Sequence, residues 1–229
     1  MNALPATPRR LSVLRVLAIV AVAAVLQASA ASAASISIAT GRLTVVTRTY
    51  GAARTCTLNA IADSYVNKAL GTTNSGTATT LLLNADSTTT ERSFVRFDLT
   101  SCSPAIPSDA LVQTAKVQLR VAVVALATRT YDLRRSTAGW VETTVTWNLQ
   151  PAVAGTATAS TTVTVGTAIG AVAEWTATSD VQSYATGAAT DLGWRVSDAS
   201  EGIFLGTPLT FGSREAATGQ PKLVVTYLP

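Results

Sequence analysis

The sequence predicts an all-β protein, a two-sheet antiparallel β-sandwich of the jelly-roll type with one short helix, preceded by a signal peptide. Short runs rich in Val and Thr alternate with clusters of Gly, Asn, Asp, Ser and Pro. Only 13% of the residues are charged, against 48% hydrophobic, which suits half-buried strands better than exposed helices. No segment between these runs is long enough for a crossover helix, so antiparallel sheets are favoured over βαβ units.

The N-terminal segment, residues 1–33, is expected to be a secretory signal. Arg9, Arg10 and Arg15 precede an apolar run over residues 16–26 and then a stretch of small residues. The A-x-A rule places cleavage after Ala33 or Ala30. The alternative, an uncleaved membrane anchor, would require about 20 apolar residues. After cleavage no membrane span is expected, and the protein would be secreted into the extracellular space.

The remaining chain divides into residues 34–56, an N-terminal linker or accessory strand, and residues 57–228, the sandwich domain. A strand is predicted over residues 43–48 in the first part. The strands predicted in the second part share β-branched or alternating apolar residues and cover residues 57–66, 80–84, 93–99, 115–124, 129–133, 144–147, 161–165, 173–176, 193–197, 208–211 and 222–227.

One short helix is predicted after the strand at 173–176. Thr178 or Ser179 can cap its N-terminus, where Asp180 favours the positive end of the helix dipole. Val181 and Tyr184 share one face at i,i+3, and Gly187 suits the C-terminal stop.

Two compositional facts restrict the chemistry. The chain contains no histidine, which excludes Ser-His-Asp and Cys-His nucleophile systems and imidazole metal sites. Loss of the signal would leave 14 basic residues against 13 acidic ones, so no basic surface for nucleic acid is expected. Cys56 and Cys102 are the only cysteines, and in an oxidising compartment they are expected to form a disulfide. Two free thiols, or half of a metal site, remain alternatives.

Several motifs occur in the order found in one family of secreted domains. They are ADSYV at 62–66, TNSG at 73–76, RSFVRFDL at 92–99, AKVQL at 115–119, WVETTVTWN at 140–148, TSDVQ at 178–182, FGSRE at 211–215 and PKLVVTY at 221–227. Over about residues 58–227 the chain resembles the DNRLRE domain family, which overlaps carbohydrate-binding module family 96. The resemblance implies a jelly-roll-type sandwich of a secreted or surface protein, similar in some cases to alginate-binding modules.

The candidate sugar-binding residues are Arg129, Tyr131, Arg134 and Arg135. Their guanidinium groups could hold uronate carboxylates in bidentate pairs, and Tyr131 could offer a ring for stacking. An ordinary charged sheet face is the alternative. Rings inside strand patterns are expected in the core, namely Trp147, Trp175, Trp194, Phe97, Phe211 and Tyr227. For Tyr65, Trp140 and Tyr131 the sequence leaves burial or exposure undecided.

The acidic residues suggest structural roles more readily than catalytic ones. Arg96 and Asp98 are expected to form an ion-pair network, joined by Arg214 and Glu215. Glu142, between two tryptophans, would be the best general acid, but a hydrogen-bonding role is favoured. No cofactor is required, although oxygen ligands near loop ends would allow a structural calcium at Asp63, Asn74 and Asp180.

These observations predict a secreted, non-catalytic carbohydrate-binding module whose partner is an extracellular or cell-wall polysaccharide, with uronate-containing polymers as candidates. The alternative is a structural or adhesive β-sandwich protein of the cell surface. An enzyme is disfavoured because no nucleophile and base can be assembled. The sequence does not predict the oligomeric state.

Overall fold

The computed structural model describes residues 32–39 and 42–229, with side chains from residue 48 onward. The chain divides into two units, Met1–Gly51 and Ala52–Pro229. The predicted signal, residues 1–33, lies outside the described residues except for Ser32 and Ala33. Across the part of the chain that is described, no helix has both the length and the apolar character needed to cross a membrane.

The first unit contains a strand pair. β1 (Ser32–Ala39) runs antiparallel to β2 (Arg42–Thr49), with Ala39 opposite Arg42 and Ser32 opposite Thr49. The strand predicted over residues 43–48 thus corresponds to β2, which pairs with β1 in a two-stranded sheet of its own.

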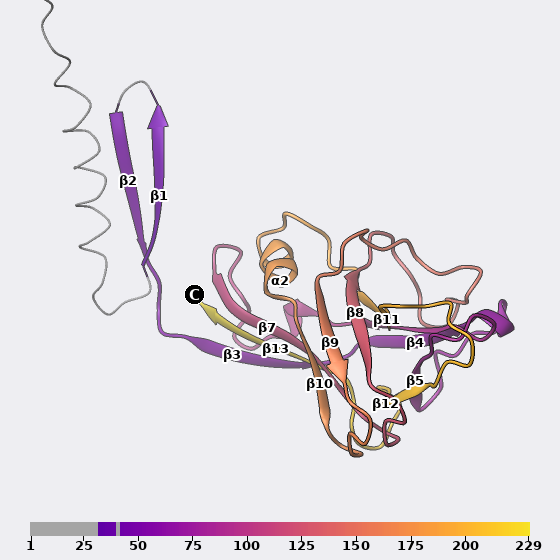
Figure 1. Ribbon diagram of the computed structural model, residues 1–229. Helices are drawn as coiled ribbons and strands as arrows, with labels where there is room; N and C mark the ends of the chain where they lie inside the picture. The colour runs from indigo at the N-terminus through magenta and orange to yellow at the C-terminus, as the bar shows by residue number, and fades with distance from the viewer. Residues whose placement is uncertain (1–31, 40–41) are drawn as a thin grey trace, which may run out of the picture. The chain divides into compact units, whose positions relative to one another are not determined.

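The second unit is a sandwich of two antiparallel sheets (Figure 1), as the sequence predicts. The four-stranded sheet has the order β10-β7-β13-β3, formed by Val172–Thr176, Leu111–Arg120, Lys222–Leu228 and Arg54–Asn59. The five-stranded sheet has the order β4-β6-β11-β8-β9, formed by Ala62–Asn67, Glu91–Arg96, Trp194–Asp198, Arg129–Arg135 and Ala159–Val163. The described part of the chain is therefore mainly β structure.

The single strand predicted over residues 57–66 is wrong, because the chain changes sheets in the middle of this run. The Ala60 amide donates to Pro221 O (3.3 Å), beside β13, whereas the next amide, that of Ile61, donates to Arg96 O (2.9 Å), at the end of β6. β3 thus ends at Asn59 and β4 begins at Ala62. An alternating pattern continues through such a crossing, since both strands bury the same kind of face.

The core lies between the two sheets. A separate pair of strands contacts both sheets. β5 (Thr80–Leu83) pairs with β12 (Leu209–Gly212). Ser93 of β6 donates its hydroxyl to Leu82 O (2.8 Å), and Ala122 N donates to Thr210 O (2.8 Å). The largest fully buried rings of this core are Trp175, Trp194, Phe97, Phe211 and Tyr227, as predicted; Trp147 is instead half-buried.

The predicted helix is α2 (Thr178–Ala185), with Val181 and Tyr184 buried and Gly187 just after its end at φ +73°. Its N-terminus differs from the prediction. Thr178 is the first helical residue, and its hydroxyl accepts a hydrogen bond from Ala115 N of β7 (3.0 Å) instead of capping the helix. The N-cap is Ala177, which makes no side-chain cap. At the N-terminus of α2, the contact of Thr178 with β7 thus takes the place of a side-chain cap.

The strand predicted over residues 144–147 is also wrong. The amides of Thr144 and Val145 both donate to Val141 O, which makes a turn. This turn belongs to a segment, residues 137–150, that we call the covering loop. Trp140 and Val145 of the loop pack with Phe94 in a second apolar cluster, separate from the main core. The β-branched residues here serve that packing and not a sheet.

The two cysteines form a disulfide, as predicted. Cys56 lies on β3, and Cys102 follows the 3-10 helix η2 (Leu99–Ser101). The bond therefore ties an outer strand of the four-stranded sheet to the segment that follows β6.

Candidate functional site

All four candidate sugar-binding residues lie on β8, but they do not form one patch. Tyr131 points into the core, where its exposed fraction is 2%. Strand alternation places Arg129 and Arg135 on the same side as Tyr131, and Arg134 on the outer side of the sheet. The buried ring of Tyr131 offers no face for stacking on a sugar. A carbohydrate role for the arginines remains a prediction.

The three arginines also have partners within the protein. Arg129 forms a bidentate pair with the buried carboxylate of Asp198, whose hydrogen bonds raise the pKa of the guanidinium. Arg134 donates to Asp132 Oδ2 (2.9 Å) and to the carbonyl of Gly155. The Arg135 Nη1 atom lies 4.0 Å from Asp180 Oδ1. A ligand carboxylate would therefore have to compete with these contacts, most strongly at Arg129.

A different arginine stands free on the outer face of the five-stranded sheet. Arg195 of β11 lies directly opposite Arg134 of β8 and Phe94 of β6 in the strand register. No other described residue forms a hydrogen bond or ion pair with its side chain, and its Nε is buried. Burial, followed by the charge of Arg92, lowers its pKa to about 10, so the guanidinium remains protonated at neutral pH. A buried donor without a partner is costly unless something else accepts from it.

Arg92, the next arginine of this face, is fully engaged. It donates from Nε and Nη2 to Glu201 (2.8 and 2.6 Å) and from Nη1 to Gln150 Oε1 (2.8 Å). Its guanidinium also covers the ring of Trp147, 4.5 Å from the centroid. Trp147 is thus half-buried under a cation. Sequence reasoning missed Arg195 because only the register of β11 against β6 and β8 brings it beside the other arginines.

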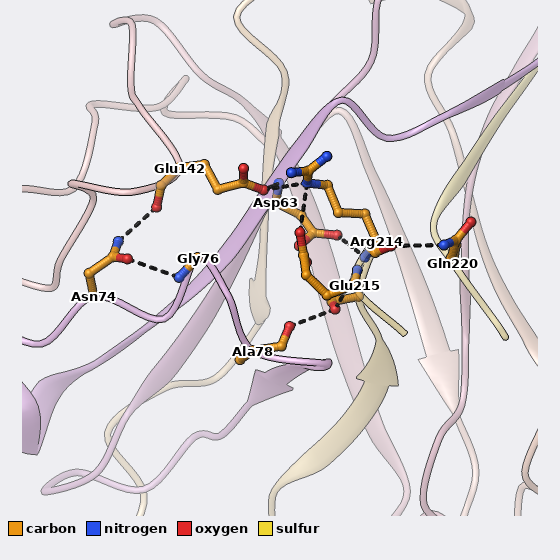
Figure 2. A network of polar contacts seen from close by, with 9 residues as sticks. Asp63, Asn74, Gly76, Ala78, Glu142, Arg214, Glu215 and Gln220 are labelled. Carbon is orange, nitrogen blue, oxygen red and sulfur yellow. Dashed lines mark hydrogen bonds and ion pairs between the residues drawn. The ribbon is translucent and has the colours of Figure 1, made fainter. Parts of the chain in front are cut away.

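A second group of charged side chains joins the covering loop to the C-terminal region (Figure 2). Carboxylate oxygens of Asp63, Glu142 and Glu215 lie within 4.8 Å of one another. Arg214 Nε donates to Glu142 Oε1 (2.6 Å), and the same nitrogen forms an ion pair with Glu215 Oε1 at 2.9 Å. Backbone amides add to this, because Asp63 N donates to Glu142 Oε1 and Arg214 N donates to Asp63 Oδ2. The favoured hydrogen-bonding role of Glu142 matches this geometry.

Asp63 is the most perturbed member of this carboxylate cluster. Its exposed fraction is 1%, and burial raises the pKa of its carboxyl to about 7, with the charges of Glu215 and Glu142 acting in the same direction. The amide of Arg214 opposes the shift. Asp63 is therefore partly protonated near neutral pH.

The expected network of Arg96, Asp98, Arg214 and Glu215 divides into separate parts. Arg214 and Glu215 pair, but Asp98 caps η2 by accepting from Thr100 N (2.9 Å). Arg96 lies over the ring of Trp140, 5.7 Å from its centroid. The prediction that Asp98 joins Arg96 is wrong because the strand ends at Arg96 and the next residues turn into the 3-10 helix.

The three candidate calcium ligands do not come together. Asn74 uses its amide group to donate to Glu142 O and Val145 O (both 2.7 Å), and its side-chain oxygen accepts from Gly76 N. Asp180 Oδ2 instead accepts from Trp194 Nε1 (2.8 Å) and from the hydroxyl of Thr158. Only Asp63 belongs to the carboxylate cluster, and there the guanidinium of Arg214 already supplies a positive charge.

Comparison with known proteins gives one result that covers most of the chain. A family model described as Carbohydrate-binding module family 96 matches residues 54–227. This range begins with β3 and ends within β13, so it spans the whole sandwich. No curated protein matches the chain.

Proposed function

The chain belongs to carbohydrate-binding module family 96, and we propose that its sandwich is a non-catalytic module of a secreted protein that holds an extracellular, uronate-containing polysaccharide. Family membership makes carbohydrate the partner. The finer assignment depends on Arg195, an unpaired guanidinium on the outer sheet face, because carboxylates are the groups that guanidinium recognises best.

The surroundings of Arg195 support a carboxylate ligand. Arg134 and Arg92 flank it, and each already has a carboxylate partner in Asp132 and Glu201. The charges of Glu201 and Asp132 also act on Arg195, but both carboxylates are in ion pairs with the other two arginines. A uronate that binds there pairs with the guanidinium of Arg195 without displacing an internal ion pair.

Secretion is supported by two independent features. The disulfide Cys56–Cys102 is typical of oxidising compartments, and the basic and apolar pattern of residues 1–33 is typical of a signal. We expect the exported protein to begin at Ala31, Ala34 or Ser35. Intact-mass measurement of protein from the culture medium tests this, and retention of Met1 would contradict it.

No cofactor is needed for this function. In the carboxylate cluster, Arg214 provides the cation that a calcium ion would otherwise supply. Its guanidinium forms ion pairs with two of the three carboxylates, so a calcium ion could bind there only by displacing this guanidinium.

Isothermal titration with oligomers of alginate and of polygalacturonate tests the assignment. The affinity should fall as salt rises, because exposed charges are screened over about 10 Å at 0.1 M. Arg195→Gln should weaken binding by roughly 1.5–3 kcal/mol, the range for hydrogen bonds to charged groups. Arg54→Gln, at an exposed position on β3, is the matched control. Equal affinity of the Arg195 variant would reject the site, and no binding to any glycan would favour the adhesive alternative.

Reaction products give a separate test of the non-catalytic assignment. Each bound oligomer is incubated with the protein and then assayed for new reducing ends and for unsaturated uronates. We expect neither, since Glu142 and Glu215 are both held in ion pairs with Arg214.

A further inference from the structure

A cavity of about 290 Å³ opens between α2, the end of β6 and the crossing from β3 to β4. Its wall includes Arg96 and Asp98, Ile61 from the β3–β4 crossing, Tyr184 of α2, and Asp191 from the segment before β11. Arg195 does not line it. The cavity is therefore a separate place from the arginine face of the sheet.

Three residues of this wall each carry a buried polar atom that has no hydrogen-bond partner among the described residues. These atoms are Arg96 Nε, Tyr184 OH and Asp191 Oδ2. Almost every buried polar group in a native protein is paired, with another group or with water. In the described chain only six side-chain atoms are exceptions, and half of them belong to residues that line this one cavity.

The three groups are held in place although their polar atoms are unpaired. Tyr184 is 8% exposed, and its ring packs against Trp194 with 5.5 Å between centroids. Asp191 Oδ1 accepts from Gly193 N (3.1 Å), which leaves Oδ2 for another partner. Gly193 has φ +74°, and a Cβ there would come within 2.3 Å of Val95 O, so this turn requires glycine. Arg96 is held over the ring of Trp140.

The chemistry of these atoms selects the kind of ligand. Arg96 Nε only donates, an ionised Asp191 only accepts, and Tyr184 OH does both. Burial raises the pKa of Asp191 to about 6, so this carboxylate is mostly ionised at neutral pH. An anion would meet the carboxylates of Asp98 and Asp191, and a metal ion would meet Arg96. A neutral polyol fits, because each of its hydroxyls donates one hydrogen bond and accepts another.

Size and apolar surface restrict the ligand further. The volume lies at the lower end of small-molecule pockets, which span roughly 300–1,000 Å³. This suits one sugar ring better than an extended chain. Ile61, Phe97 and Leu99 supply carbon surface for the C–H face of a ring.

We propose that this cavity binds the uncharged terminal sugar residue of a glycan, with adjacent hydroxyls shared among Arg96, Tyr184 and Asp191. The proposal rests on the family's carbohydrate binding, but it concerns a second site with a different ligand class. The protein would thus hold a chain end in the cavity, independently of uronates on the sheet face.

The test uses the purified full-length protein and methyl pyranosides of glucose, galactose and mannose, followed by saturation-transfer NMR and titration calorimetry. At least one glycoside should bind. Tyr184→Phe and Asp191→Asn should each weaken it about tenfold or more. Tyr65→Phe, a tyrosine of β4 outside the cavity, is the matched control and should bind as wild type does.

A stability measurement separates a binding role from a structural one. Tyr184→Phe removes a buried hydroxyl that has no internal partner, so its thermal midpoint should be equal to or above that of wild type. A clear drop in the midpoint would overturn the proposal, since it would mean that the hydroxyl serves the fold.

The remaining outcomes distinguish the two proposals. If no methyl glycoside binds while uronate oligomers do, the cavity proposal falls and the sheet-face function stands. If glycosides bind equally to wild type and both cavity variants, the cavity proposal also falls. If neither class of glycan binds, both proposals fall.

Discussion

The two halves of the outer face of the five-stranded sheet differ in how they are covered. Over β4 and β6 the covering loop places Trp140 and Val145 on Phe94, Ala62 and Val66, which makes a second apolar core. Over β11 and β8 the face carries Arg195, Arg134 and Asp132. The same sheet thus uses one half for stability and leaves the other half charged. Burial of the first half allows the second to keep a desolvated, unpaired cation.

Replacing Trp140 should have the largest effect, because it removes the center of the apolar half. Trp140 is 7% exposed and donates from Nε1 to Leu192 O (2.9 Å). Trp140→Ala should lower the free energy of unfolding by about 3–5 kcal/mol, the range for large core rings. Urea unfolding measures this. Trp147→Ala is the comparison, because this half-buried ring packs at the edge of the same cluster beneath Arg92 and should cost less. An equal loss there would contradict the central place of Trp140.

Breaking the disulfide should affect both halves alike. Cys102→Ser opens a loop with a sequence separation of 46 residues. It should cost up to about 4 kcal/mol, which acts mainly through the unfolded chain. The thermal midpoint should fall by several degrees while the far-UV spectrum and uronate affinity of the folded protein stay unchanged. Altered affinity would show that the bond also shapes the charged half.

The pH dependence of stability tests the cluster beneath the covering loop. The pKa of Asp63 is raised to about 7 by burial, above its ordinary value of 3.8. The folded state therefore binds the proton more tightly, and its stability should fall as pH rises from 4 to 8, on the order of 2 kcal/mol. Asp63→Asn should flatten this slope and stabilise the protein at pH 8. Urea unfolding of both proteins across this pH range measures the slope. If Asp63→Asn has the same slope as the wild type, the pH dependence does not come from Asp63.

Two arginines of β8 sharpen the comparison on the charged half. Arg134 faces outward beside Arg195, whereas Arg135 faces the other side of the sheet. Arg134→Ala should weaken uronate binding by about 1 kcal/mol, and adding Arg135→Ala should change little more. Titration calorimetry of the single and double variants measures the difference. If the double variant loses much more than the single one, the binding surface includes the far side of β8.

Calcium should have the smallest effect. Since Arg214 already bridges Glu142 and Glu215, addition of calcium or of a chelator should leave the thermal midpoint within about 1 °C. Arg214→Met supplies the contrast, because without the guanidinium the carboxylates Asp63, Glu142 and Glu215 should acquire calcium-dependent stability. A calcium-dependent rise in the thermal midpoint of the wild type would contradict the assignment of Arg214 as the cation of the cluster.

The sequence predicted the fold class because strand periodicity and turn residues are local signals. It located the strands near β8 and β11 and the buried face of α2. It missed the sheet change at Ala60, where the alternation continues unbroken across two strands. The sequence also predicted a strand over residues 144–147, because β-branched residues that pack under a turn give the same local pattern as those in a strand.

The candidate sites were harder to predict than the fold. Neighbouring arginines in the sequence suggested a patch on β8, but alternation sends Arg134 and Arg135 to opposite sides. The groups that the structure brings together come from distant segments, as in the pairing of Asp63 with Arg214 across 151 residues. Such pairings depend on which distant strands become neighbours, and the pattern within one segment does not identify its partner.

The neighbouring positions of β3 and β13 have a consequence for when the protein can fold. The first strand of the sandwich, with Arg54 opposite Tyr227, needs the last strand as its partner. During synthesis the four-stranded sheet therefore cannot be completed until β13 has left the ribosome. Pairing across such a long loop is also slow. If the protein is exported, as we propose, this delay is useful, because it keeps the polypeptide unfolded until the translocation machinery has taken it.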